Sequence, residues 1–230
     1  MNRKHLKTVF KDTLPVLTGY LFLGAGFGIL LKEKTDLGLL WAFGMSVCML
    51  AGSGQYLAVN LMADGASLIS SAIATFLVNA RHIFYGISLL EPYKGAGKKK
   101  PYMIFALTDE TYSLVTQNEP PEGMKRHTYC FLVSLFDHIY WITGCCIGNL
   151  LGALPIDFTG VEFVLTALFV TMFVEQWLSN KNHLPAIIGI CATAACLAIF
   201  GREIFLIPSM ALIAALLVIS KKTGRRAEDV

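Results

Sequence analysis

The chain has 230 residues, of which 55% are hydrophobic and only 15% are charged, and its formal net charge is +3. A chain of this size cannot enclose so much apolar surface in a water-soluble core, because small domains keep a large surface-to-volume ratio. The composition therefore excludes an ordinary soluble domain and predicts a protein that is embedded in a lipid bilayer.

Seven apolar runs follow one another along the chain, and most approach or exceed the roughly 20 residues that a helix needs to cross a bilayer. They are residues 13–31, 38–62, 66–90, 127–152, 158–178, 184–200 and 204–220. We predict an all-α, polytopic helical membrane protein with about six to eight transmembrane segments. The crossing count stays open because the short stretch 102–117, which carries Asp109 and Glu110, is either a half-helix or a tight span.

Lysine and arginine gather in three clusters, at residues 3–11, 94–100 and 221–226. Short basic loops prefer the cytoplasmic face of a membrane, so we expect the three clusters to share that side. The predicted location is the bacterial cytoplasmic (inner) membrane, as a multi-pass protein. The clusters flank apolar runs and do not cover the face of a soluble domain, so no nucleic-acid partner is expected.

An internal repeat relates the two halves of the sequence. The glycine motif of residues 20–31 recurs 120 positions later, so that Tyr20, Gly24, Gly28, Leu30 and Leu31 pair with Tyr140, Gly144, Gly148, Leu150 and Leu151. After one inserted residue, Gln55 pairs with Gln176 and Arg81 with Arg202. We predict one transmembrane transporter domain, residues 1–230, with two internal three-element repeats at about 12–100 and 132–220. Small residues permit close helix packing, so the equivalent glycines should lie at close contacts.

Polar residues interrupt the apolar runs and predict broken helices at mid-membrane. The interruptions are Gly52-Ser53-Gly54-Gln55, Asn79-Ala80-Arg81-His82 and Gly201-Arg202-Glu203. We expect the element broken at residues 79–82 to return the chain to the side from which it entered, which places 94–100 on the side of the amino terminus. Breaks at membrane depth are tolerated only inside protein or beside a cavity, and they are typical of substrate sites in secondary transporters.

The candidate substrate-binding residues are Gly52, Ser53, Gly54, Gln55, Asn79 and Arg81. The Arg81 guanidinium offers paired donors that match a carboxylate, and Asn79 can add amide contacts. The alternative interpretation is an internal ion pair between Arg81 and Asp109 or Glu110.

Ionisable groups at bilayer depth are costly and mark functional sites by default. We predict five proton-coupling or ion-pair candidates, namely His82, Asp109, Glu110, Arg202 and Glu203. A histidine among apolar neighbours can also be a packing residue, which applies to His82 and to His138. No catalytic residues, metal ligands or cofactors are predicted, because the six cysteines lie in apolar runs without a CxxC pair and no nucleophile elbow is present.

At these same positions the chain resembles the AzlC family. The resemblance rests on Ala51-Gly52-Ser53-Gly54-Gln55-Tyr56, Asn79-Ala80-Arg81-His82-x-x-Tyr85-Gly86, Thr108-Asp109-Glu110 and Trp141-x-x-Gly144-x-x-x-Gly148. These motifs occur in the family's order over most of the chain.

The resemblance implies a non-enzymatic permease that exports branched-chain amino acids such as leucine, isoleucine and valine. It also implies a small AzlD-type membrane subunit encoded by a separate gene. The chain has no Walker A loop, so we expect transport to be coupled to the proton gradient. Two other functions stay open: a channel or permease for another small solute, and a membrane assembly subunit that transports nothing.

Overall fold

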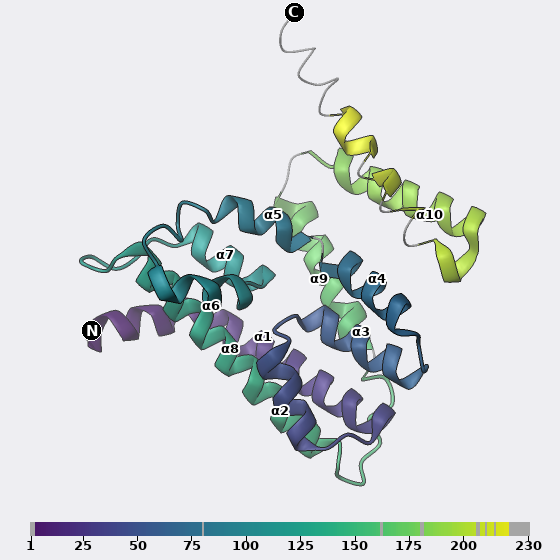
Figure 1. The fold of residues 1–230 in the computed structure, drawn as a ribbon, viewed down its shortest axis with the longest axis horizontal. Helices are drawn as coiled ribbons and strands as arrows, with labels where there is room; N and C mark the ends of the chain where they lie inside the picture. Colours follow the sequence, from purple (N-terminus) through teal and green to yellow (C-terminus); the bar gives the residue numbers. More distant parts are fainter. Residues whose placement is uncertain are drawn as a thin grey trace, which may run out of the picture. The chain divides into compact units, whose positions relative to one another are not determined.

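The computed structural model describes residues 3–79, 81–161, 163–179, 182–205, 208–209, 211–213 and 215–220 (Figure 1). Within these residues the chain forms helices and turns and no strand. The helices are α1 (Arg3–Thr35), α2 (Leu39–Cys48), α3 (Gly52–Ala63), α4 (Leu68–Asn79), α5 (Arg81–Ser88), the 3-10 turn η1 (Gly97–Lys99), α6 (Lys100–Phe105), α7 (Asp109–Gln117), α8 (Arg126–Leu151), α9 (Phe163–Ser179) and α10 (Leu184–Ile204). The chain divides into two compact units, residues 1–166 and 167–230.

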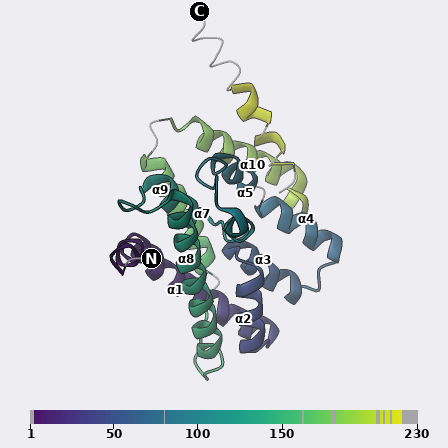
Figure 2. The ribbon, with the colours of Figure 1, turned by 60° about the vertical axis from the view of Figure 1, so that its left-hand side comes forward.

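The first unit is built on α1 and α8, which lie side by side and run in the same direction (Figures 1 and 2). Near the start of both helices, the Tyr129 hydroxyl donates to Asp12 Oδ2 at 3.0 Å. Near their ends, Gly148 lies against the backbone of Ala25. The start of α1 therefore contacts the start of α8, and the end of α1 contacts the end of α8. Two helices in contact in this order run parallel.

Glycines allow the two backbones to touch. A Cβ atom at Gly24 would lie 2.9 Å from the backbone nitrogen of Cys145, and Gly144 faces the backbone of α1 in return. A methyl group at Gly28 or Gly148 would overlap backbone atoms of the other helix. Side chains of any size are therefore excluded from this face, as in small-xxx-small packing. The prediction that the equivalent glycines of the two halves lie at close helix contacts is confirmed.

After α1 the chain turns and continues as α2, which runs antiparallel to α8. At the far end of α8, Asn149 Nδ2 donates to the backbone oxygen of Leu37 at 3.0 Å. At the middle of α8, His138 Nε2 lies 3.1 Å from the backbone oxygen of Ser46. The helix stops there, and residues 49–51 form a non-helical link. The predicted interruption at residues 52–55 therefore lies three residues earlier, and Gly52, Ser53, Gly54 and Gln55 form the first turn of the next helix.

The next helix, α3, turns back toward the end of α1. Its Tyr56 hydroxyl donates to the backbone oxygen of Leu23 at 2.8 Å. One turn further on, Lys34 Nζ donates to Asn60 Oδ1 at 2.9 Å. Helices α2 and α3 therefore form a hairpin that enters from the end where α1 finishes, reaches the middle and returns.

Helices α4 and α5 carry the chain from that end to the opposite one. The amide of Asn79, the last residue of α4, lies beside Gly54 at the middle of the unit. After α5, Leu89 and Tyr93 are buried in the same cluster as Val9, near the start of α1. This broken segment therefore passes through the unit, which Figure 1 also shows.

Helices α6 and α7 form a second hairpin, which enters from the end where α1 and α8 begin. Met103 is buried at that end with the start of α8. The turn after α6 reaches the middle, where the hydroxyls of Thr108 and Tyr20 lie 2.6 Å apart. By the end of α7 the chain has returned, since the Arg126 guanidinium donates to the backbone oxygen of Val115.

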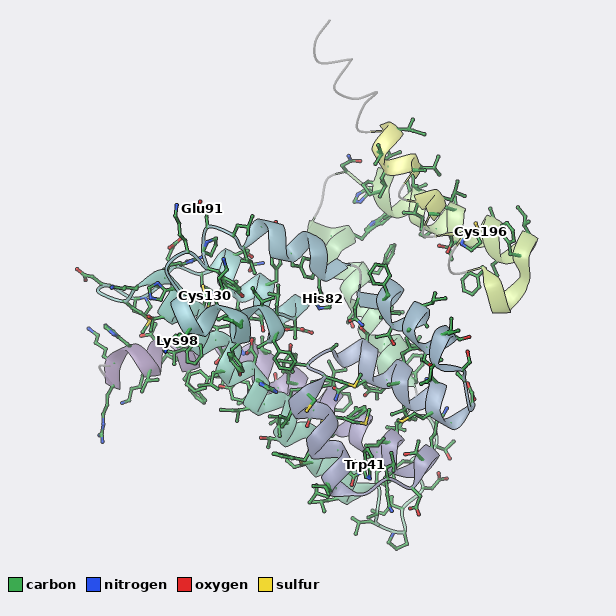
Figure 3. The ribbon with its side chains drawn as sticks, in the orientation of Figure 1. Trp41, His82, Glu91, Lys98, Cys130 and Cys196 are labelled. Atoms are coloured by element: carbon green, nitrogen blue, oxygen red, sulfur yellow. The ribbon has the colours of Figure 1, made fainter. Side chains whose placement is uncertain are left out.

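The observed path corrects two predictions. The element broken at residues 79–82 does not return to its starting side, whereas the run 38–62, predicted to be a span, does. Each error reverses the end of the unit at which the following chain is expected, so the two errors cancel. The basic loop 94–100 still lies at the amino-terminal end of the unit. Figure 3 shows Lys98 and Glu91 at that end and Trp41 toward the other.

Three uninterrupted helices among the described residues are long and apolar enough to cross a membrane: Arg3–Thr35, Arg126–Leu151 and Leu184–Gly201. The all-α class is confirmed. The count of six to eight segments stays a prediction, because α4 and α5 are too short to be identified separately.

In the second unit, α10 is interrupted at Gly201, where φ is 72°. This confirms a backbone break at the predicted Gly201-Arg202-Glu203 motif, although the side chains of Arg202 and Glu203 lie outside the described structure, as does the basic cluster 221–226. The two-repeat organisation stays a prediction. By the offset of 121, residues 170–172 are equivalent to the non-helical link 49–51. They lie inside α9, so the second half has no break at the equivalent position.

We predict that Gly28→Ala destabilises the protein by about 1–3 kcal/mol, because the added methyl overpacks a backbone contact. The midpoint of thermal unfolding of the purified protein in detergent should fall accordingly.

The matched control is Gly19→Ala on the same helix. No atom lies within 4 Å of a Cβ atom at Gly19. Alanine should therefore be neutral or stabilise the helix by up to about 1 kcal/mol. Equal midpoints for Gly28→Ala and Gly19→Ala would contradict the assigned helix contact.

A second prediction concerns the two ends of the first unit. In a background without native cysteines, Lys98→Cys should react with a membrane-impermeant thiol reagent only from the cytoplasmic side, and Asp64→Cys only from the opposite side. Both positions are exposed. Labelling of both from one side would show that α4 and α5 do not carry the chain across the membrane.

Candidate functional site

Three helices begin at the middle of the α1–α8 pair, namely α3, α5 and α7. The first turn of a helix has backbone N–H groups without intrahelical partners and carries a partial positive charge. The starts of α3 and α7 are linked by side chains of α1 and α8, since Tyr20 of α1, which reaches α7, packs edge-on against Trp141 of α8 at a ring distance of 5.3 Å. Trp141 in turn contacts α3. The middle of the unit is therefore a polar layer between apolar ends.

The start of α3 carries no negative charge of its own. Its N-cap residue is Ala51, which has no side-chain acceptor, and no acidic residue occupies the first turn. Trp141 Nε1 donates to Gln55 Oε1 at 2.5 Å, and Gln55 is fully buried. No described atom accepts a hydrogen bond from Gln55 Nε2. The wide Trp141 ring lies over Gly52, which explains why glycine begins this helix.

Asn79 brings a second amide to the same place. Its Nδ2 donates to the backbone oxygen of Thr75 at 2.9 Å and lies 3.1 Å from the position of a Cβ at Gly54. The buried Asn79 Oδ1 has no hydrogen-bond partner in the described structure. An unused acceptor at Asn79 and an unused donor at Gln55 therefore flank Gly54.

The start of α7 differs from that of α3. Thr108 is its N-cap, and the Thr108 hydroxyl accepts from the backbone nitrogen of Thr111 at 3.2 Å. The first turn holds Asp109 and Glu110. The Tyr20 hydroxyl donates to Glu110 Oε2 at 2.8 Å. Carboxylates favour the positive end of a helix, so α7 already carries the negative charge that α3 lacks.

Asp137 lies on α8 opposite the start of α7. It is fully buried, and its Oδ2 accepts from the Thr111 hydroxyl at 2.7 Å. Its Oδ1 has no partner among the described atoms. A buried carboxyl group with half of its hydrogen-bonding capacity unused is costly in a structural role and is a mark of a functional one.

The neighbouring His138 joins the two hairpins. The backbone oxygen of Ser46 can only accept, so His138 Nε2 donates to it at 3.1 Å. In the neutral ring, Nδ1 then accepts from the Tyr102 hydroxyl at 3.0 Å. Both ring nitrogens have partners from α2 and α6, so His138 is a packing and bridging residue.

The other predicted residues have different outcomes. His82 Nδ1 donates to the backbone oxygen of Asn79 at 3.0 Å, across the interruption between α4 and α5 (Figure 3). Ser53 is buried in the first turn of α3. The side chain of Arg81 lies outside the described structure, so its predicted role as a carboxylate ligand or ion-pair partner stays a prediction.

Sequence reasoning missed the hydroxyl groups of this layer. The sequence patterns identify Tyr20 only as part of the repeat and Thr108 only as part of a family motif, and they do not identify Thr111. One local signal existed for Thr108, because threonine directly before two acidic residues is typical of a helix N-cap. Nothing local indicates that Tyr20, 88 residues away, contacts Thr108.

The arrangement offers two chemistries at one level of the protein. The uncharged start of α3, with Gln55 and Asn79, presents donors and an acceptor to a small zwitterion. The start of α7, with Glu110 and the nearby Asp137, can hold and exchange protons.

The chain is similar to known proteins over most of its length. The family model described as AzlC protein matches residues 15–154. "Branched-chain amino acid transport protein AzlC" of Bacillus subtilis (strain 168) is 36% identical over 96% of this chain and 87% of that protein. An "Uncharacterized membrane protein" of Haemophilus influenzae is 40% identical over 89% and 84%, and "Inner membrane protein YgaZ" of Escherichia coli (strain K12) is 26% identical over 86% and 81%. No solved structure matches the chain.

The family match covers the whole polar layer, from Tyr20 to Trp141, and the relatives span both compact units. This multi-pass membrane protein therefore belongs to the AzlC family.

Proposed function

We propose that the protein is a secondary transporter that exports branched-chain amino acids from the cytoplasm, coupled to the proton gradient and assembled with a small AzlD-type membrane subunit. The observation that carries the proposal is the likeness, over 96% of this chain, to a Bacillus subtilis protein named for branched-chain amino acid transport. The export direction, the small subunit and the proton coupling go beyond that likeness and are part of the proposal.

The architecture supports transport. Two hairpins enter from opposite ends and meet a broken crossing segment at one level. Discontinuous helices at mid-membrane are the usual framework of substrate sites in secondary transporters, because their half-helix starts bind anionic groups. Backbone that is not helical is tolerated at this depth only where protein or water satisfies it.

The division of charge supports an amino-acid substrate. The start of α3 has no acidic residue and carries the partial positive charge of a helix N-terminus, so it suits the carboxylate, to which Gln55 Nε2 adds a donor. Asn79 Oδ1 is an acceptor suited to the ammonium group. An ammonium and a carboxylate on one carbon match a donor and an acceptor that flank Gly54.

Export can be tested in cells that lack their own leucine exporters and are fed a leucine-containing dipeptide, which raises internal leucine. Expression of this chain with its small subunit should increase leucine release and lower the internal concentration, both measured by mass spectrometry. An alanine dipeptide serves as the substrate control, and each subunit alone as the assembly control. Leucine release equal to that of the empty vector would refute export.

Arg81→Lys and Arg81→Gln test the substrate-carboxylate role. Loss of a paired, charge-assisted contact should reduce leucine efflux about tenfold or more, because hydrogen bonds to charged groups contribute about 1.5–3 kcal/mol. Lys98→Gln, in an exposed loop, is the control that also removes a cation.

Membrane abundance separates the two interpretations of Arg81. Normal abundance with lost efflux supports the substrate role. Reduced abundance supports the ion pair, since removal of one partner leaves a buried charge unpaired. Normal efflux from either variant removes Arg81 from the mechanism.

A further inference from the structure

Asp137 has one hydrogen-bond partner among the described residues. Its side chain is fully buried, and the Thr111 hydroxyl, 2.7 Å away, is the one described group that bonds to it. A proton that reaches or leaves Asp137 in this conformation therefore passes through Thr111.

Thr111 continues into an unbroken series of hydroxyl groups. The Thr111 and Thr108 hydroxyl oxygens are 3.1 Å apart, and those of Thr108 and Tyr20 are 2.6 Å apart. The Tyr20 hydroxyl is 2.8 Å from Glu110 Oε2. Every step lies within hydrogen-bond distance, and the series begins and ends on a carboxyl group.

We propose that Glu110, Tyr20, Thr108, Thr111 and Asp137 form a proton-transfer chain that moves one proton between the half-buried Glu110 and the fully buried Asp137. This inference rests on the proposed proton coupling and assigns its route. Tyr20, Thr108 and Thr111 are the relay groups.

The transfer moves a single proton from one carboxyl group to the other. When Glu110 takes up a proton, the Tyr20–Glu110 hydrogen bond reverses and Glu110 donates to Tyr20. In this starting arrangement Tyr20 donates to Thr108, Thr108 to Thr111, and Thr111 to the Asp137 carboxylate. In the transfer each donor breaks one O–H bond and each acceptor forms one, so Asp137 becomes the acid and Glu110 the carboxylate. The three hydroxyls are chemically unchanged but their hydrogen bonds now point the other way. A hydroxyl both donates and accepts, so both arrangements are satisfied.

Thr108 can serve in both arrangements without unfolding α7. Its oxygen has two acceptor sites, and one stays bonded to the backbone nitrogen of Thr111 throughout. In the first arrangement Thr108 accepts from the Tyr20 hydroxyl and donates to Thr111. In the second it accepts from the Thr111 hydroxyl and donates to Tyr20. The cap of the helix is thus preserved while the proton moves.

Other titratable groups lie on the elements that carry or adjoin the chain. Tyr56 lies on α3, Tyr102 on α6, Asp109 and Tyr112 on α7, and His138 and Tyr140 on α8. Both ring nitrogens of His138 already have partners, and the Tyr140 hydroxyl pairs with Thr13 at 3.1 Å. The hydrogen bonds of Tyr56, Tyr102, His138 and Tyr140 lead to other groups. The hydroxyl series is therefore the connection between the two carboxyl groups that the described structure shows.

Thr111→Val tests the chain because it removes the relaying hydroxyl and keeps the side-chain shape. The purified complex in liposomes gives two rates: leucine exchange at equal pH, and leucine accumulation driven by a pH gradient. We expect the ratio of driven accumulation to exchange to fall at least about tenfold, since a positioned proton-transfer group contributes factors of this order or larger. Tyr20→Phe should lower the ratio in the same way.

Two control variants keep the ratio of the unmodified protein. Thr111→Ser retains the hydroxyl, and Thr13→Val removes a buried hydroxyl from the Thr13–Tyr140 pair, which lies outside the chain. A normal ratio in Thr111→Val would overturn the proton-transfer chain. Exchange without any gradient-driven accumulation by the unmodified protein would overturn proton coupling as a whole, and the chain with it.

A second measurement tests the chain without leucine, so its result does not depend on which substrate the protein transports. Infrared spectroscopy at acidic pH follows the deuteration of the Asp137 carboxyl after transfer to D2O, and Asp137→Asn identifies its band. Deuteration should slow at least about tenfold in Thr111→Val and stay fast in Thr111→Ser, because the buried acid loses its exchange route. Equal deuteration rates in both variants would refute the chain whatever the substrate.

Discussion

The backbone contact between α1 and α8 constrains the rest of the first unit. Gly24 and Gly28 face Gly144 and Gly148, and the two helices run in parallel. Two parallel helices that start at the same end require the chain between them to return an odd number of times. The broken segment α4–α5 makes that return once, and the hairpins α2–α3 and α6–α7 leave the count unchanged. Close packing of glycines therefore determines a topology, and through it the end at which the basic loop 94–100 lies.

The same constraint brings three interruptions to one level. Non-helical backbone and polar side chains are expensive at membrane depth unless other protein groups satisfy them. Here each hairpin supplies partners to another element: Ser46 O of α2 accepts from His138, and Tyr102 of α6 reaches the same ring. Interruptions that would be costly alone stabilise one another when they share a layer. This mutual satisfaction explains how three breaks persist in one apolar unit.

Within that layer, the groups left without partners are unevenly distributed, and the distribution separates two tasks. Gln55 Nε2 and Asn79 Oδ1 lie near a helix start that has no acidic residue. Glu110 and Asp137 lie beside a helix start that is capped by Thr108. Tyr20 and Trp141, whose rings are in contact, connect the two regions. The proposed substrate site and the proposed proton site share this aromatic contact and can influence each other's geometry through it, which is the physical requirement for coupled transport.

The all-α membrane class, the family, the break at Gly201, a break close to Gly52 and the close packing of the repeated glycines could all be predicted from the sequence. They depend on local quantities: hydrophobicity, run length, backbone preference and side-chain size. The tertiary structure decided which broken segment crosses and which returns. Hydropathy measures how well lipid tolerates a run and carries no information on its direction. The structure also decided that Tyr20, Thr108, Thr111 and Asp137 meet. Contacts separated by 26 to 90 residues depend on how α1, α7 and α8 pack, and no local pattern records that packing.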